Sequence, residues 1–234
     1  MSPLTMLVLA AAACQAPDAN AIIVGTVERV NRDVLTGARV EFLKDRYKED
    51  TSDALDIHLE ETVVSLVRTN GRQKTEQKLM KNGKPVRNSK PSPSELDLSR
   101  LLSDRFLFSM ADPCPVNIAG SDHWAIHFEP RPGLPEGDDL EEKLLNHLAG
   151  ILYVDKERWF LRHATARLAE PFNQDVIGTV EEGSINLEQQ EFAGVVVQRY
   201  VVVDIAYTIN LVFFKRHKSM RLTYDFREFK TVQQ

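Results

Sequence analysis

The chain has 234 residues, of which 43% are hydrophobic and 27% are charged, and its formal net charge at pH 7 is −5. This is ordinary globular composition. A nucleic-acid-binding protein normally shows a basic balance or a basic patch, so we expect no nucleic-acid partner. Outside the N-terminus no apolar run approaches about 20 residues, so the sequence predicts no transmembrane helix.

The N-terminus carries an apolar run at residues 4–13, LTMLVLAAAA, which is too short to span a bilayer and is typical of a secretory signal. Two processing sites fit this run. Three alanines followed by Cys14 resemble a lipoprotein signal, in which Cys14 would be acylated and would anchor the protein in a membrane. The segment Ala19-Asn20-Ala21 instead fits a small-x-small cleavage site. We therefore expect residues 1–21 to be a signal or lipoprotein leader and residues 22–234 to be one domain.

The first half of the mature chain mixes one helix with short strands. Apolar residues at helical spacing predict an amphipathic helix over 22–36. The dipeptides Asn70-Gly71 and Asn82-Gly83 tolerate positive φ and predict turns of an antiparallel meander. Further predicted segments are strands at 38–49, 55–69 and 72–80, a loop at 88–93, a helix at 95–104, strand-like runs at 106–108 and 124–128, a Pro/Gly-rich excursion at 129–138 and a helix at 139–148.

The longest predicted strand is Val195–Leu211, VVVQRYVVVDIAYTINL. Its odd positions are apolar except for Arg199, and its even positions include polar residues. We therefore expect one face to be buried and the other to be exposed to solvent. At roughly 3.3 Å per residue it would run about 55 Å, which favours a strongly curved sheet or an open barrel over a flat sandwich.

From Gly150 onward the pattern is almost entirely β. Predicted strands cover 150–156, 158–170, 184–192, 195–211 and 213–229. No helical pattern separates them, and parallel strands would need crossovers, so we expect an antiparallel sheet. The fold class predicted is mainly β with short helices: a strongly curved antiparallel sheet, or incomplete barrel, with helices plugging its concave face.

The order of strands from Gly150 to Phe229 adds a family resemblance. A short strand carrying Tyr153-Val154-Asp155 leads into a long strand that closes at Glu170-Pro171; a polar strand, the longest strand and a final strand ending in DFREFK follow. This order resembles the bacterial outer-membrane lipoprotein-sorting-like proteins. Their superfamily includes the periplasmic lipoprotein carrier, its outer-membrane acceptor and the sensor domain of a periplasmic anti-sigma-factor regulator. The convincing part covers about eighty residues.

This resemblance implies a half-barrel whose concave apolar face holds acyl chains. Burying a lipid chain there is favourable by roughly 0.8 kcal/mol per CH₂. The predicted partner is a lipid or an acylated lipoprotein, and the predicted location is the periplasm or outer membrane (inner leaflet) of a Gram-negative bacterium. The candidate cavity-lining residues are Val197, Val201, Val203, Ile205, Tyr207, Met220, Leu222, Tyr224 and Phe226. The alternative interpretation of the same residues is plain core.

Signatures of catalysis are missing from the sequence: no GxSxG, HExxH, P-loop or GxGxxG occurs. His123 and His127 have a metal-like spacing, but a strand would hold them about 13 Å apart, too far to share an ion. We therefore expect no enzyme activity, cofactor or metal. The function predicted is non-enzymatic binding of a lipid or acyl chain. A periplasmic protein-interaction or envelope-stress sensor module on the same scaffold is the alternative.

Overall fold

The structure is a computed structural model that describes residues 17–35, 39–51, 57–70, 73–93, 104–113, 115–135, 137, 140–174, 178–210 and 215–232. The described elements are α1 (Ala19–Leu35), β1 (Arg39–Thr51), β2 (Ile57–Asn70), β3 (Gln73–Lys81), β4 (Lys84–Pro85), β5 (Ser92–Pro93), β6 (Phe106–Met110), β7 (Val116–Ile118), β8 (Ser121–Pro130), α2 (Leu140–Asn146), β9 (Leu148–Asp155), β10 (Leu161–Leu168), β11 (Phe172–Gln174), β12 (Gly178–Phe192), β13 (Val195–Asn210) and β14 (Lys215–Thr231).

The described strands form one curved sheet of fourteen strands, in the order β4-β3-β2-β1-β14-β13-β12-β10-β9-β8-β6, with β5, β7 and β11 attached to its sides. Every described pairing is antiparallel. The two ends of the path, β4 and β6, do not pair with each other, so the sheet stays open. The predicted fold class, an incomplete antiparallel barrel with short helices, is confirmed.

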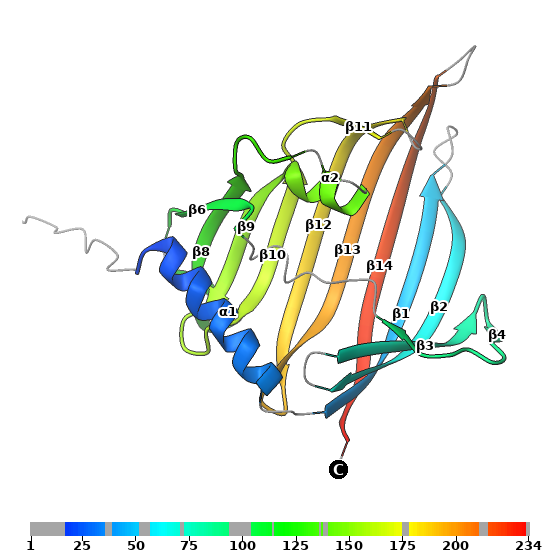
Figure 1. The fold of residues 1–234 in the computed structure, drawn as a ribbon, viewed down its shortest axis with the longest axis horizontal. Coiled ribbons are helices and arrows are strands. Elements are labelled where there is room, and N and C mark those ends of the chain that lie inside the picture. The colour runs from blue at the N-terminus through cyan, green and yellow to red at the C-terminus, as the bar shows by residue number, and fades with distance from the viewer. Residues whose placement is uncertain are drawn as a thin grey trace, which may run out of the picture.

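Both described helices cross the same face of the sheet (Figure 1). On α1, Ile22 and Ile23 are buried, and on α2, Leu144 and Leu145 are buried; all four belong to the same hydrophobic core as the central strands. Arg105, just before β6, ties α2 down through Asn146 Oδ1 at 2.9 Å and Glu142 Oε1 at 3.0 Å. We call the helix-covered face the concave face. Among the described helices, neither is long and apolar enough to cross a membrane.

Several predicted boundaries need correction. The strand predicted at 158–170 begins only at Leu161, because Asp155 Oδ1 accepts the backbone N–H groups of Glu157 and Arg158 and closes a turn there. The excursion predicted from residue 129 begins after Pro130, which still pairs with Phe106. The loop predicted at 88–93 ends in β5, which pairs with β3.

Other predictions hold or lie outside the described residues. The helix α1 starts three residues earlier than predicted, at Ala19. The turn at Asn82-Gly83 has positive φ at both residues, 49° and 73°, as predicted for this dipeptide. The predicted helix at 95–104 lies outside the described residues except for Asp104, and so do Gly71 and Cys14.

Candidate functional site

The nine predicted cavity-lining residues lie on the concave face of β13 and β14. Cross-strand neighbours in an antiparallel pair project to the same side. Val201 pairs with Tyr224, and Val203 pairs with Leu222. We call the set the apolar stripe: Val197, Val201, Val203, Ile205, Tyr207, Met220, Leu222, Tyr224 and Phe226.

Burial divides this apolar stripe in two. Most members are buried in the core, with Val201 fully inaccessible. Tyr207, Met220 and Leu222 are only partly buried against the core. The stripe is therefore packed core at one end and reaches solvent at the other. The acyl-chain cavity itself stays a prediction.

The neighbouring strand β1 gives the concave face a second, charged half. Four alternate cross-strand pairs, all on this face, each join an apolar residue of β14 to a charged residue of β1. They are Phe226 with Lys44, Tyr224 with Arg46, Leu222 with Lys48 and Met220 with Asp50. The apolar stripe thus ends at one strand boundary, and charge begins on the next strand.

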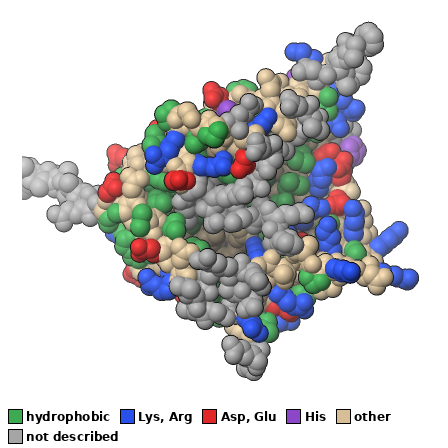
Figure 2. Space-filling model, in the orientation of Figure 1, with side chains coloured by type: hydrophobic (Ala, Val, Ile, Leu, Met, Phe, Trp, Pro, Cys, Tyr) green, Lys and Arg blue, Asp and Glu red, His purple; other side chains and the backbone are tan. Residues whose placement is uncertain are grey.

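The charges continue onto β2 and β3. We call the concave face of β1, β2 and β3 the charged wing. Lys44 pairs with Glu76, and Arg46 pairs with Glu61, which also accepts Lys81 Nζ at 2.5 Å. Figure 2 shows Lys and Arg side chains gathered on the β1–β4 side of this face and hydrophobic side chains on the β8–β10 side. The concave face as a whole is amphiphilic.

The Lys44–Glu76 pair is buried within this wing, with side-chain exposures of 6% and 10%. Tyr224 of the apolar stripe lies beside it, since the Lys44 Nζ is 5.6 Å from the centroid of the Tyr224 ring. Ser65, the cross-strand neighbour of Lys44, is fully buried, and its Oγ has no hydrogen-bond partner in the described structure. Sequence alternation alone gave no sign of this pair, because β1 alternates poorly.

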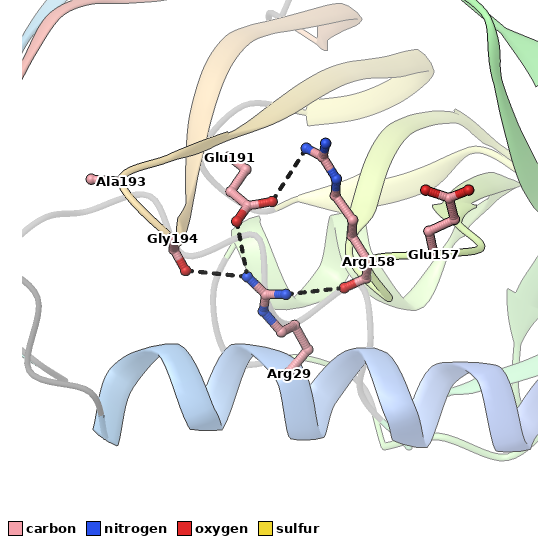
Figure 3. Close-up of a pocket in the computed structure, with 6 residues that line it drawn as sticks. All are labelled: Arg29, Glu157, Arg158, Glu191, Ala193 and Gly194. Carbon is pink, nitrogen blue, oxygen red and sulfur yellow. Dashed lines mark hydrogen bonds and ion pairs between the residues drawn. The ribbon is translucent and has the colours of Figure 1, made fainter.

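A polar cavity of 520 Å³ lies at the other end of the molecule, where α1 meets two hairpin turns (Figure 3). Arg29 of α1 donates to the Gly194 carbonyl at 3.1 Å and the Arg158 carbonyl at 3.3 Å, and lies 3.5 Å from Glu191 Oε1. Arg158 Nη1 reaches Glu191 Oε2 at 3.3 Å. Arg29, Arg158 and Glu191 thus pair with one another, and their contacts hold α1 over the two turns. We interpret this cavity as a structural junction.

The histidines do not assemble into a centre. His123 is buried, with Nδ1 2.9 Å from the Ser121 carbonyl and Nε2 4.0 Å from Asp155 Oδ2, whereas His127 is exposed. Burial lowers the pKa of His163, which stacks at a tilt beside Tyr153. Within the described ranges, no group of three or more His, Cys, Asp or Glu residues is arranged to hold a metal ion.

Thr208, His217 and Glu181 form a small cluster on the opposite, convex face. The Thr208 hydroxyl lies 2.7 Å from His217 Nδ1 and donates to Glu181 Oε1 at 2.6 Å. In a nucleophilic triad the two imidazole nitrogens link different partners. Here the hydroxyl and the carboxylate both approach the same Nδ1, so the cluster is a cross-strand hydrogen-bond network and not a relay.

Comparison with known proteins shows no matching family model and no matching curated protein. Among solved structures, the chain is similar to a DUF1329 family protein from Desulfovibrio piger, with 10% identity, a TM-score of 0.44 and coverage of 92% of this chain and 94% of that one. It is also similar to MucB in complex with MucA(peri), with 8% identity, a TM-score of 0.28 and coverage of 93% and 100%.

A third structure, the MucA/MucB complex of Pseudomonas aeruginosa, gives 8% identity, a TM-score of 0.29 and coverage of 92% and 100%. At these identities and TM-scores the similarity assigns no role to any residue. The fold and the site described above rest on the contacts of this chain alone.

Proposed function

We propose that this chain is a non-enzymatic, exported binding module that holds an amphiphile, a lipid or a lipoprotein acyl chain, on the concave face of its open sheet. The observation that carries the proposal is the strand boundary between β14 and β1, where four apolar residues face four charged ones in register. An amphiphile has the same division, with an apolar chain joined to a polar end.

The free energy of burying methylene groups favours the apolar stripe as the binding site of the acyl chain. Each CH₂ removed from water contributes roughly 0.8 kcal/mol, so a few methylenes against Tyr207, Met220 and Leu222 outweigh the loss of one polar contact. These three residues are only partly buried, which leaves them accessible to a ligand. The resemblance of residues 150–229 to lipoprotein-sorting-like proteins supports the same assignment and the periplasmic location.

The test compares two neighbouring substitutions on β14. Leu222 and Thr223 are adjacent and half-buried, and they project to opposite faces of the sheet. We expect Leu222→Glu to weaken binding of a fluorescent fatty acid by about tenfold or more, because a carboxylate would lie against the acyl chain. Thr223→Glu should leave the Kd within about twofold. Absence of fatty-acid binding by the unmodified chain, or an equal loss in both variants, would exclude the proposal.

A second candidate function, a protein-interaction or sensor module, is favoured by the convex face of β1, β2 and β3. Tyr47, Ile57, Leu59 and Met80 are all large, apolar and exposed there, with Ile57 69% accessible. Apolar side chains that gather on an uncovered sheet face often mark a contact surface. Crosslinking to a periplasmic protein that Leu59→Lys abolishes and Leu222→Glu preserves would favour this function over lipid binding.

A further inference from the structure

Five side chains gather where the accessible end of the apolar stripe meets the charged wing. We call them the junction cluster: Lys48, Asp50, Glu60, Tyr207 and Lys218. They come from β1, β2, β13 and β14, and strand pairing brings them together. Lys48 faces Leu222, Asp50 faces Met220, and Lys218 faces Tyr207. The cluster therefore borders the proposed seat of the acyl chain directly.

The cluster contains two lysines and two carboxylates, but these four groups do not all pair with one another. Lys48 Nζ lies 2.6 Å from Glu60 Oε2 and 3.9 Å from Asp50 Oδ1. Among the described residues, Asp50 Oδ1 has no hydrogen-bond partner. The charge of Lys218 favours the ionised forms of Asp50 and Glu60, but Lys218 forms no ion pair with a described residue. The cluster therefore has one carboxylate oxygen without a donor and one ammonium without a direct acceptor.

The pKa values of Asp50 and Tyr207 also indicate that a cation would be stabilised in this cluster. Burial, and then the neighbouring Glu60 carboxyl, raise the pKa of Asp50. Burial, and then the charge of Asp50, raise the pKa of the Tyr207 phenol. Negative charge at Asp50 is therefore under-compensated, and a cation placed between Asp50 and the Tyr207 ring would relieve it.

We propose that the junction cluster binds the head group of a zwitterionic phospholipid of the ethanolamine class. Its ammonium lies against the partly exposed Asp50 carboxylate and the ring of Tyr207, and its phosphate faces Lys218, with the acyl chain running along the apolar stripe. A purely anionic head group would meet Lys218 but would also face two carboxylates. A purely cationic one would bring no acceptor for Lys218. This inference rests on the proposed lipid-binding function.

The experiment compares three tail-matched probes on the mature chain: lysophosphatidylethanolamine, lysophosphatidylglycerol and the free fatty acid. We expect lysophosphatidylethanolamine to bind about tenfold more tightly than lysophosphatidylglycerol. Asp50→Asn should remove that preference. Glu49→Gln is the matched control, because Glu49 is the half-buried neighbour of Asp50 on the opposite face.

The outcomes separate the two proposals. Fatty-acid binding without any preference between the two lysolipids overturns the head-group assignment and leaves the proposed function standing. A preference that survives Asp50→Asn also overturns the assignment. Failure of all three probes to bind overturns both proposals. Circular dichroism and thermal unfolding of each variant show whether a lost affinity reflects a lost fold.

Discussion

At the scale of single residues, one glycine determines how closely α1 approaches the sheet. A Cβ placed on Gly25 would lie 2.5 Å and 2.6 Å from two ring carbons of Trp159. That ring has little freedom to move, because it packs edge-on to Trp124 at a centroid distance of 4.7 Å and its backbone has a positive φ of 56°. The absence of a side chain at Gly25 therefore lets the helix pack directly against the Trp159 indole.

We predict that Gly25→Ala destabilises the protein even though alanine is the better helix former. Overpacking of this kind costs about 1–3 kcal/mol, whereas the gain in helix propensity is only about 1 kcal/mol. Urea unfolding followed by tryptophan fluorescence measures the difference. Val24→Ala, on the exposed side of the same helix, is the control and should change stability by about 0.5 kcal/mol or less. A stabilised Gly25→Ala variant would contradict the described contact.

A residue's position can be predicted from the sequence when it depends on neighbours along the chain, and not when it depends on residues far away in the sequence. Alternation along 195–211 predicts which side chains of β13 share the concave face, because the period of a strand is local. The pairing of Leu222 with Lys48 joins positions about 170 residues apart, and no local pattern specifies that register. The apolar half of the site is therefore readable from the sequence, and its charged half is not.

At the scale of elements, Arg29 and Asp33 attach α1 to two hairpin turns. Arg29 Nε donates to Asp33 Oδ1 at 2.8 Å, and Asp33 Oδ2 in turn accepts the backbone N–H of Val196 at 3.2 Å. The Arg29 side chain is 19% exposed, so its contacts to Gly194 and Glu191 are partly shielded from water. The turns between β9 and β10 and between β12 and β13 are thereby held beneath one helix.

We expect Arg29→Met to lower the free energy of unfolding by about 1–2 kcal/mol, because α1 loses its hydrogen bonds to the Gly194 and Arg158 carbonyls. Amide hydrogen exchange should increase first in α1, because the Arg29 contacts hold this helix in place. Arg32→Met is the matched control: Arg32 is exposed, one turn further along the helix, and its loss should have little effect. Equal effects of the two substitutions would show that Arg29 does not anchor the helix.

The sequence predicts the long elements, but it gives no signal for two of the short strands that pair along a longer one. The helix α1 and the strands β12, β13 and β14 each span many residues, so a hydrophobic period has room to repeat. The strands β7 and β11 have three residues each and form only because a longer strand lies beside them. Their existence depends on tertiary pairing, which a local pattern does not encode.

At the scale of the whole molecule, the open sheet separates three surfaces of different chemistry. The apolar stripe and the charged wing share the concave face, and exposed apolar residues occupy the convex side of β1, β2 and β3. The lack of helical crossovers after Gly150 predicts an antiparallel sheet, and the length of β13 predicts its curvature. The apolar stripe and the charged wing are brought side by side by the pairing of β1 with β14, an early and a late strand of the chain.

The position of α1 bears on how the N-terminus would be processed. The helix starts at Ala19, which is 2% exposed, and the backbone N–H of Ile22 bonds to the Asp18 carbonyl at 3.1 Å. Cleavage after Ala21 would remove this first turn and a buried side chain, whereas cleavage before Cys14 would leave the helix whole. Processing at Cys14 is therefore the outcome that preserves the described fold.

We predict that mass spectrometry of the chain, expressed in a Gram-negative host, finds an acylated Cys14 at the mature N-terminus. Cys14→Ser should abolish the lipid mass and release the protein from the membrane fraction without changing its thermal unfolding, because Cys14 precedes the helix. A version that begins at Ile22 serves as the comparison and should unfold at lower temperature, since it lacks Ala19 and the Asp18 carbonyl. A mature chain that begins at Ile22 and unfolds like the longer one would show that the first turn of α1 is dispensable and that the protein is not anchored through Cys14.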